Sequence, residues 1–184
     1  MSLKKAFLHF KTITHHRHLV MKGCFKVGLY KQGLLHDLSK YSWTEFRVGA
    51  RYYQGTRSPN NAEREETGLS TAWLHHKGRN KHHYEYWIDY DINAKDGEMP
   101  LTGMKMPVKY VVEMFIDRIS ASKNYLGDKY QDDSALTYYL KGRGHYIIHP
   151  ESDALLYKLL QMNADKGEEA TFAYIRKYVL KNKK

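Results

Sequence analysis

The chemistry in this sequence centres on a histidine–aspartate pair, His36 and Asp37, within the segment GLLHDLSKYS. Imidazole nitrogens and carboxylate oxygens are ligands of Zn, Fe, Mn and similar divalent ions. Because an aspartate carries two oxygens, Asp37 could touch two metal ions while His36 binds one of them. The pair alone is a weak signal, since about 0.6 such pairs are expected by chance in a chain of this composition. Its meaning therefore depends on the other metal-ligating residues.

Eleven histidines are distributed unevenly along the chain. Three lie close together on the first predicted helix, His15, His16 and His18, and four more lie within nine residues: His75, His76, His82 and His83. Neighbouring residues of a helix point to different faces, so only one ring of the first pair would face inward. Each histidine alone has a structural explanation, as a surface residue or as a ring stacked on the aromatic run after His83. Several buried imidazoles without partners would be costly to desolvate, which favours a shared metal site.

A last candidate ligand, Asp117, follows a run of mostly apolar residues within PVKYVVEMFIDRISAS. A carboxylate in such a place is rarely buried unless it is paired or bound to a metal. Glu113 lies one turn earlier on the same face and could orient a ligand. The alternative for Asp117 is an ion pair with Arg118 or another base.

The elements that must position these residues are predicted to be helices. Apolar residues recur at three- and four-residue steps from Leu3 to about Gln32, and Gly33 is a candidate interruption. A short helix from Leu34 to Lys40 is predicted to carry the His-Asp pair. Ser42 to Glu45 has the pattern of a capping box, which predicts a helix to about Gln54. Residues 55–69 are polar and are predicted to form a surface loop or lid.

The rest of the chain continues this pattern. A short helix capped by Ser70 or Thr71 is expected to run through His76, followed by a turn at 78–81, a helical piece at 82–89 and a loop at 90–106. Pro107 is expected to begin a long helix, 108–126, which Gly127 ends. Two further helices are predicted near 151–163 and 168–181, within a helical C-terminal segment 151–184. No strand alternation, repeat or low-complexity tract is recognisable. The sequence therefore predicts one all-α domain, a helical bundle over residues 1–184.

Composition and charge limit the classes of function. Cys24 is the only cysteine, which excludes an intramolecular disulfide and favours a reducing compartment, the cytoplasm. No window approaches the roughly 18 apolar residues of a membrane span, so no membrane partner is expected. The net charge is +10, and residues 1–60 contain 11 Lys or Arg against 2 acidic residues. Such a segment attracts polyanions, including nucleic acid, or is simply a solvated face.

Taken in order, a histidine on the first helix, His36-Asp37, a histidine cluster and Asp117 resemble the HD-domain superfamily of metal-dependent phosphohydrolases. The segment LLHDLSK resembles that family's LLHDIGK type of segment, including the lysine three residues after the aspartate. VVEMFIDRISAS resembles the later helix that carries the final aspartate ligand, and HHKGRNKHHYEYW is similar to the paired-histidine segment of the two-metal branch. The whole chain looks like an uncharacterised bacterial and phage family of small HD-like proteins.

The resemblance implies a fold of HD-domain type and one or two divalent ions, of Fe, Mn, Zn, Ni, Co or Mg. The implied metal ligands are His16, with His15 as its rival, His36, Asp37, His75 or His76, His82, His83 and Asp117. The candidate catalytic residues at such a site are Asp37, Lys40 and Glu113. Lys40 would offset charge on a phosphoryl group or else be a plain surface side chain. Glu113 would orient a ligand, and either Glu113 or Glu85 would carry a proton.

The expected activity is hydrolysis of a phosphorylated small molecule, such as a nucleotide or another phosphate ester, by a metal-activated hydroxide. Two alternatives come from other classes. One is a di-iron oxygenase of the HD fold, which uses a similar ligand set. The other is a non-catalytic helical protein that binds nucleic acid through the basic first segment, although base-stacking aromatics are not interleaved with the basic residues there.

Overall fold

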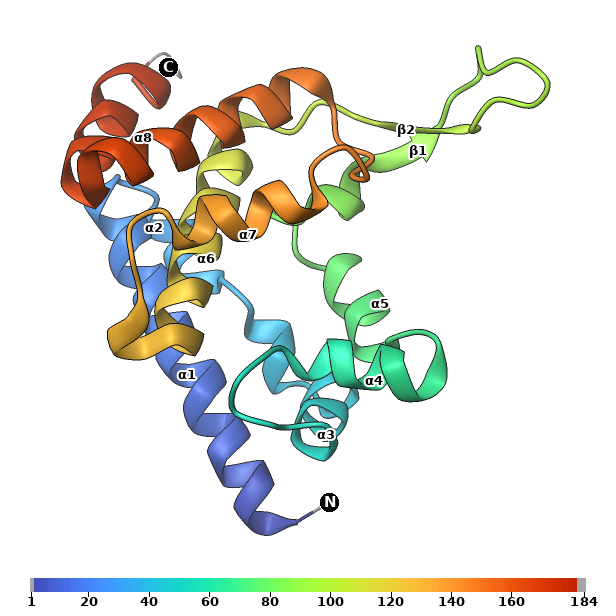
Figure 1. The fold of residues 1–184 in the computed structure, drawn as a ribbon, viewed down its shortest axis with the longest axis vertical. Helices are drawn as coiled ribbons and strands as arrows, with labels where there is room; N and C mark the ends of the chain where they lie inside the picture. The colour runs from blue at the N-terminus through green and yellow to red at the C-terminus, as the bar shows by residue number, and fades with distance from the viewer. Residues whose placement is uncertain (1, 182–184) are drawn as a thin grey trace.

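The computed structural model describes residues 2–181, and nearly all of its regular structure is helical (Figure 1). The predicted all-α fold is confirmed. The long helix α1 (Leu3–Lys26) packs against α2 (Tyr30–Leu35), α3 (Trp43–Arg51) and α6 (Val108–Leu126). Further along the chain, α8 (Pro150–Tyr174) packs on α6 and α7 (Ser134–Gly142). The helices of the first and last thirds of the chain thus enclose α6.

The hydrophobic core lies around α6 because this helix is covered by α1, α7 and α8. It contributes a run of buried side chains from Val111 to Ile116, and α8 adds Leu156 and Leu160. α1 and α6 approach each other closely at Gly23, where an added Cβ would lie 2.6 Å from Cγ2 of Ile116. This close packing brings together the faces of the two helices that carry His16 and Asp117.

The predicted helix from Leu34 to Lys40 is wrong at its centre. α1 ends at Lys26, Gly28 follows with a φ of +84°, and α2 then continues through Gly33 instead of breaking there. α2 ends at Leu35, and a 3-10 helix, η1 (Leu38–Tyr41), follows after two residues. His36 and Asp37 therefore lie between two helices.

The predicted loop or lid over residues 55–69 is also wrong, because it contains the helix α4 (Pro59–Thr67). Pro59 occupies the start of the helix, where its missing N–H costs nothing. The buried carboxylate of Glu63 accepts hydrogen bonds from the hydroxyls of Ser70 and Thr71, at 2.5 and 2.7 Å. These bonds fix the segment to the start of α5 (Thr71–Lys77).

The predictions for the other elements are mixed. The long helix is confirmed, and Gly127 with a φ of +53° ends it. The predicted helical piece at 82–89 is a 3-10 turn, η2 (Tyr84–Trp87), and the predicted loop at 90–106 contains most of an antiparallel hairpin of β1 (Ile88–Tyr90) and β2 (Leu101–Gly103). η3 (Gly127–Lys129) and α7 were not predicted. The two C-terminal helices join into α8, interrupted by the non-helical Gly167, and a π-helix, η4 (Ile175–Val179), follows.

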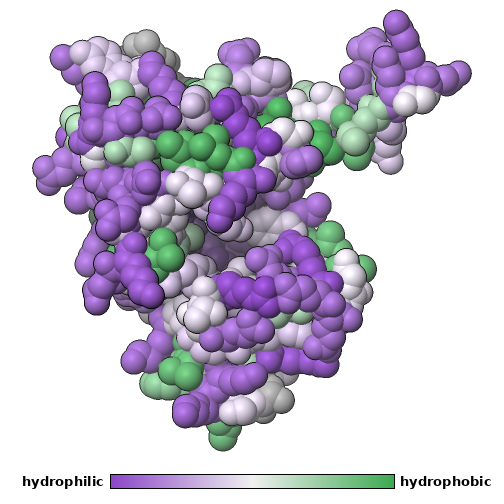
Figure 2. All heavy atoms as spheres, in the orientation of Figure 1, coloured by the Kyte–Doolittle hydropathy of each residue, from purple (hydrophilic) through white to green (hydrophobic). Residues whose placement is uncertain are grey.

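The surface in Figure 2 is mostly hydrophilic and is hollowed between the part that contains α7 and the part that contains α3 and α4. The hairpin projects away from the rest of the molecule in the same view. Among the described residues, the helices lack the length and apolar character that crossing a membrane requires.

Candidate metal centre

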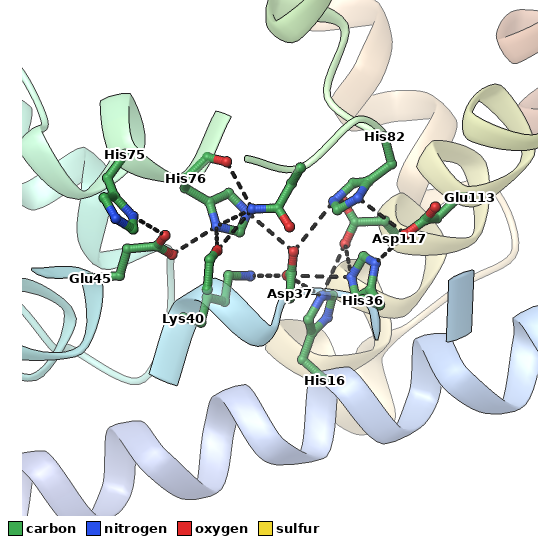
Figure 3. A network of polar contacts seen from close by, with 12 residues as sticks. His16, His36, Asp37, Lys40, Glu45, His75, His76, His82, Glu113 and Asp117 are labelled. Atoms are coloured by element: carbon green, nitrogen blue, oxygen red, sulfur yellow. Dashed lines mark hydrogen bonds and ion pairs between the residues drawn. The ribbon is translucent and has the colours of Figure 1, made fainter. Parts of the chain in front are cut away.

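The site is a buried cluster of imidazoles and carboxylates around Asp37 (Figure 3). Its residues come from α1, the junction between α2 and η1, α5 with the segment after it, and α6. They are His16, His36, Asp37, His76, His82, His83 and Asp117. Elements far apart in the sequence thus converge on one carboxylate.

The backbone of Asp37 is unusual, and this conformation places the pair. Asp37 has φ 55° and ψ 23°, and it is the one non-glycine residue with a positive φ among residues 2–181. The left-handed conformation costs an L-residue roughly 1–2 kcal/mol, and such strain gathers at functional sites. Successive side chains of a helix point to different faces, whereas this turn lets His36 and Asp37 face the same interior point.

A first group of possible ligands consists of His16, His36, Asp37 and Asp117, each offering one atom within 4.8 Å of the others. Nε2 of His16 lies 2.9 Å from Oδ1 of Asp117 and 3.7 Å from Oδ2 of Asp37. Nε2 of His36 lies 3.3 Å from the same Oδ2 of Asp37 and 3.6 Å from Oδ1 of Asp117. Two nitrogens and two carboxylates therefore face one point.

A second group consists of Asp37, His76, His82 and His83. Nε2 of His76 lies 3.2 Å from Oδ1 of Asp37, and Nε2 of His82 lies 3.4 Å from that oxygen. Oδ2 of Asp37 thus faces the first group, while Oδ1 faces the second. One carboxylate is shared between two sets of ligands.

The atoms at the centre lack hydrogen-bond partners, although they are buried. They are Nε2 of His16, His36, His76 and His82 and both carboxylate oxygens of Asp37. Nε2 of His76 lies 3.2 Å from Oδ1 of Asp37, and the ammonium of Lys40 forms an ion pair with Oδ2, but neither contact has the direction of a hydrogen bond. Buried polar atoms without partners are costly, and a cation at the point they share would satisfy them. The donor set, imidazole plus carboxylate, fits a divalent transition metal ion.

The opposite ring nitrogens are held by carboxylates outside the centre. Nδ1 of His36 lies 2.9 Å from Oε1 of Glu113, and Nδ1 of His82 lies 3.2 Å from the same oxygen. Nδ1 of His76 lies 2.8 Å from Oε2 of Glu45. When Nδ1 donates its proton in a hydrogen bond to a carboxylate, Nε2 keeps its lone pair free to bind a metal ion. Metal-ligating histidines have this arrangement. Glu113 therefore orients one histidine of each group.

The electrostatics of the site favour positive charge at its centre. Burial acts against a charged His36, but the carboxylates of Asp37, Asp117 and Glu113 together outweigh it and raise the pKa of His36 well above its ordinary value. Burial likewise acts against a charged Asp37, yet the neighbouring His36 and Lys40 hold the pKa of Asp37 well below its usual range. Burial and the nearby ring of His82 depress the pKa of His83, so this imidazole stays neutral, as a ligand must.

Lys40 lies at the edge of the centre, with its Nζ 2.6 Å from Oδ2 of Asp37. Its side chain is 30% exposed, so it contacts the shared carboxylate and solvent at once. The alternative of a plain surface lysine does not fit this position.

Two predicted or weighed histidines lie outside both groups. Nδ1 of His75 lies 2.6 Å from Oε1 of Glu45, because its ring points to another face of α5 than that of His76. His15, the rival of His16, faces Asn124, with Nδ1 2.8 Å from the amide oxygen.

Glu45 contacts the candidate ligand His76, and the sequence did not predict this contact. As predicted, Ser42 caps α3 by accepting from the backbone N–H of Glu45, at 3.5 Å. The carboxylate of Glu45, however, does not complete a capping box and instead contacts His75 and His76. Ser39 and Asn80, also unpredicted, lie 3.1 Å from Nδ1 of His76. The pairing of Glu45 with a histidine 31 residues later leaves no local signal.

Fold and site together define an all-α protein in which helices and the segments between them bring together largely buried histidines and carboxylates that could hold a metal ion. The chain belongs to a family of unknown function, DUF5662, whose model matches residues 5–162. This range contains every residue of the centre. No curated protein and no solved structure matches the chain. Membership of the HD-domain superfamily stays a prediction.

Proposed function

We propose that the protein is a metal-dependent phosphohydrolase that acts on a nucleotide or another phosphate ester. The observation that carries this proposal is the sharing of Asp37, whose Oδ2 faces His16 and His36 while its Oδ1 faces His76 and His82. A carboxylate shared in this way suits two divalent ions side by side, an arrangement used to clamp the attacking and leaving oxygens of a phosphoryl group.

The residues of the chain have separable roles in this proposal. Divalent ions held at the centre would supply a water of lowered pKa and positive charge toward the phosphoryl oxygens. Asp37 and Asp117 supply the negative charge that holds them, and Glu113 fixes the direction of two imidazoles. Lys40 places an ammonium at the partly exposed edge, where it can pair with a phosphate oxygen.

The second group favours one further candidate. It combines three histidines with a single carboxylate, His76, His82, His83 and Asp37, and imidazole-rich sets of this kind also hold iron in oxygenases. A di-iron oxygenase would contain iron as purified and would consume oxygen with its substrate. Elemental analysis together with oxygen uptake separates this candidate from the phosphohydrolase.

The proposed function is tested by measuring metal content and activity on a panel of phosphate esters. The variant Asp37→Ala is expected to lose both bound metal and phosphatase activity, because it removes ligand atoms from both groups. His9→Ala is the matched control, since His9 is buried on α1 and packs on Phe46 and Tyr53, and it belongs to neither group of possible ligands. Unchanged metal stoichiometry in Asp37→Ala would refute the site.

A further inference from the structure

The hairpin of residues 88–103, here called the arm, has no role in the metal centre. At its base, Gly103 rests on the backbone of Ile148 and His149, where an added Cβ would lie 2.6 Å from the backbone nitrogen of His149. Beyond this base, the arm projects from the molecule (Figure 1) and closes on itself, as in the hydrogen bond from the Asp91 N–H to the Pro100 carbonyl, at 3.0 Å. A lone two-stranded hairpin is marginally stable in water, so the arm lacks support of its own.

The arm exposes apolar side chains and carries negative charge. Ile92 is 94% exposed and Tyr90 is 74% exposed, and Met99 is also in contact with solvent. The arm contains four acidic residues against a single lysine, Lys95: Asp89, Asp91, Asp96 and Glu98. Within residues 2–181, the ion pairs to Lys and Arg involve none of these four carboxylates. Exposed apolar side chains with polar residues around them are typical of a docking element.

A complementary surface, here called the basic face, lies on α1, α2 and η1. Leu3, Phe7 and Phe10 form an exposed stripe at helical spacing on α1. Arg17 ties this helix to the end of α2 through a 2.6 Å hydrogen bond to the carbonyl of Leu34. The basic face comprises the exposed apolar residues Leu3, Phe7, Phe10, Leu34, Leu35 and Leu38 and the basic residues Lys4, Lys11, Arg17 and Lys31.

The positive charge of the basic face favours an acidic partner surface. Residues 1–36 contain seven Lys or Arg and no Asp or Glu. Two basic faces would repel each other, whereas the acidic arm complements the face in charge and in apolar character. The arm and the N-terminal end of α1 lie at opposite ends of the molecule (Figure 1), so they do not meet within one chain.

We propose that the arm of each molecule docks on the basic face of a second copy, giving a two-fold dimer with two reciprocal contacts. Because the arm and the N-terminal end of α1 lie at opposite ends, an antiparallel pair forms both contacts at once and closes the assembly. Ile92 and Tyr90 cover the leucines and phenylalanines of the partner, and the carboxylates of the arm meet its lysines. The inference does not depend on the proposed enzymatic function.

The experiment measures the mass of the full chain in solution by sedimentation and light scattering. Wild type is expected to be a dimer that dissociates with rising salt. An arm variant, Asp89→Lys with Asp96→Lys, and a face variant, Lys4→Glu with Lys11→Glu, are each expected to be monomeric. When the two variants are mixed, the basic arm of one meets the acidic face of the other, and the second contact pairs a wild-type arm with a wild-type face. Both contacts are then complementary, so a dimer of one copy of each is expected.

Controls distinguish the proposed contact from a general effect of charge. The variant Asp128→Lys with Glu169→Lys changes the charge by the same amount outside the arm and is expected to stay dimeric. Unchanged circular dichroism melting of each variant shows that it is folded. Ile92→Ser is expected to weaken the dimer without any change of charge.

Several outcomes would overturn the proposal. They are a monomeric wild type at its highest soluble concentration, arm and face variants that still dimerise alone, and a mixture that stays monomeric. Should wild type be monomeric while the face variant loses affinity for duplex DNA or for vesicles rich in anionic lipid, the basic face binds polyanions, and the dimer is refuted.

Discussion

Glu113 contacts one histidine of each ligand group, whereas Glu45 contacts a histidine of the second group alone. Oε1 of Glu113 lies 2.9 Å from Nδ1 of His36 and 3.2 Å from Nδ1 of His82. Glu45 accepts from His76 at 2.8 Å, and its other contact is to His75, outside both groups. Removing the negative charge of Glu113 should therefore weaken the whole centre, and the same change at Glu45 should weaken half of it.

The variant Glu113→Gln keeps the size of the side chain but turns its charged oxygens into an amide. Loss of an outer partner of this kind costs about 10–100-fold in metal affinity, or about 1.4–2.7 kcal/mol. We expect a loss of this size for metal bound by either ligand group in Glu113→Gln. In Glu45→Gln we expect it for the second group only.

The assay is titration of the chelator-treated protein with Mn²⁺, Zn²⁺ or Fe²⁺ by calorimetry, with competition against a chelator for tight sites. Asp117→Asn serves as the reference for the first group, because Asp117 is a candidate ligand of that group alone. If Glu113→Gln binds metal with the affinity of wild type, or resembles Glu45→Gln by weakening one ion, the orienting role assigned to Glu113 is refuted.

Three further predictions concern residues in and near the centre. Asp37→Ala and Asp37→Gly should both lose metal. In urea unfolding with chelator present, the glycine variant should be more stable than the alanine variant by about 1–2 kcal/mol, because φ 55° strains any residue with a Cβ. Equal stabilities of the two variants would contradict this strain. Lys40→Gln should lower kcat for the best phosphate ester by about 10²-fold at unchanged metal content, since it removes one cationic contact; an unchanged kcat would exclude Lys40 from the reaction. Burial and the nearby charge of Lys40 lower the pKa of His9 from 6.5 to about 4. Below about pH 6.5 the unfolded chain then takes up a proton that the folded protein refuses, so His9 costs up to about 3 kcal/mol of stability as the pH falls to 4. In His9→Gln this part of the pH dependence of unfolding should disappear, and an identical pH profile would show that His9 titrates normally.

The long helix α6 could be predicted from sequence because each of its signals is local. Pro107 precedes it, apolar residues repeat along it, and Gly127 ends it with a positive φ of 53°. The prediction of a helix through His36 and Asp37 was wrong because the signal that decides this segment is not local. Its residues fit a helical pattern, but the need to aim both side chains at one point overrides that preference and places Asp37 in a strained turn.

The candidate ligands could be chosen by residue type, but their partners could not. Glu45 satisfied a local pattern at the start of α3, which concealed its contact with His76 on α5. The polar composition of residues 55–69 suggested a loop, yet Glu63 secures α4 through hydrogen bonds to Ser70 and Thr71. In both cases a buried carboxylate acts across elements, and no spacing rule along one segment detects such a contact.

The glycine at the crossing of α1 and α6 has a consequence for ionic radius. Gly23 sets the distance between these helices, since an added Cβ would lie 2.6 Å from Ile116. The same two helices carry His16 and Asp117, whose facing atoms are 2.9 Å apart. A methyl group at position 23 would wedge the helices apart and widen the gap between opposing donors, which would shift preference from smaller ions such as Zn²⁺ toward larger ones such as Mn²⁺. A residue about two helical turns from His16, the candidate ligand on α1, would thus help to determine which ion such a centre prefers.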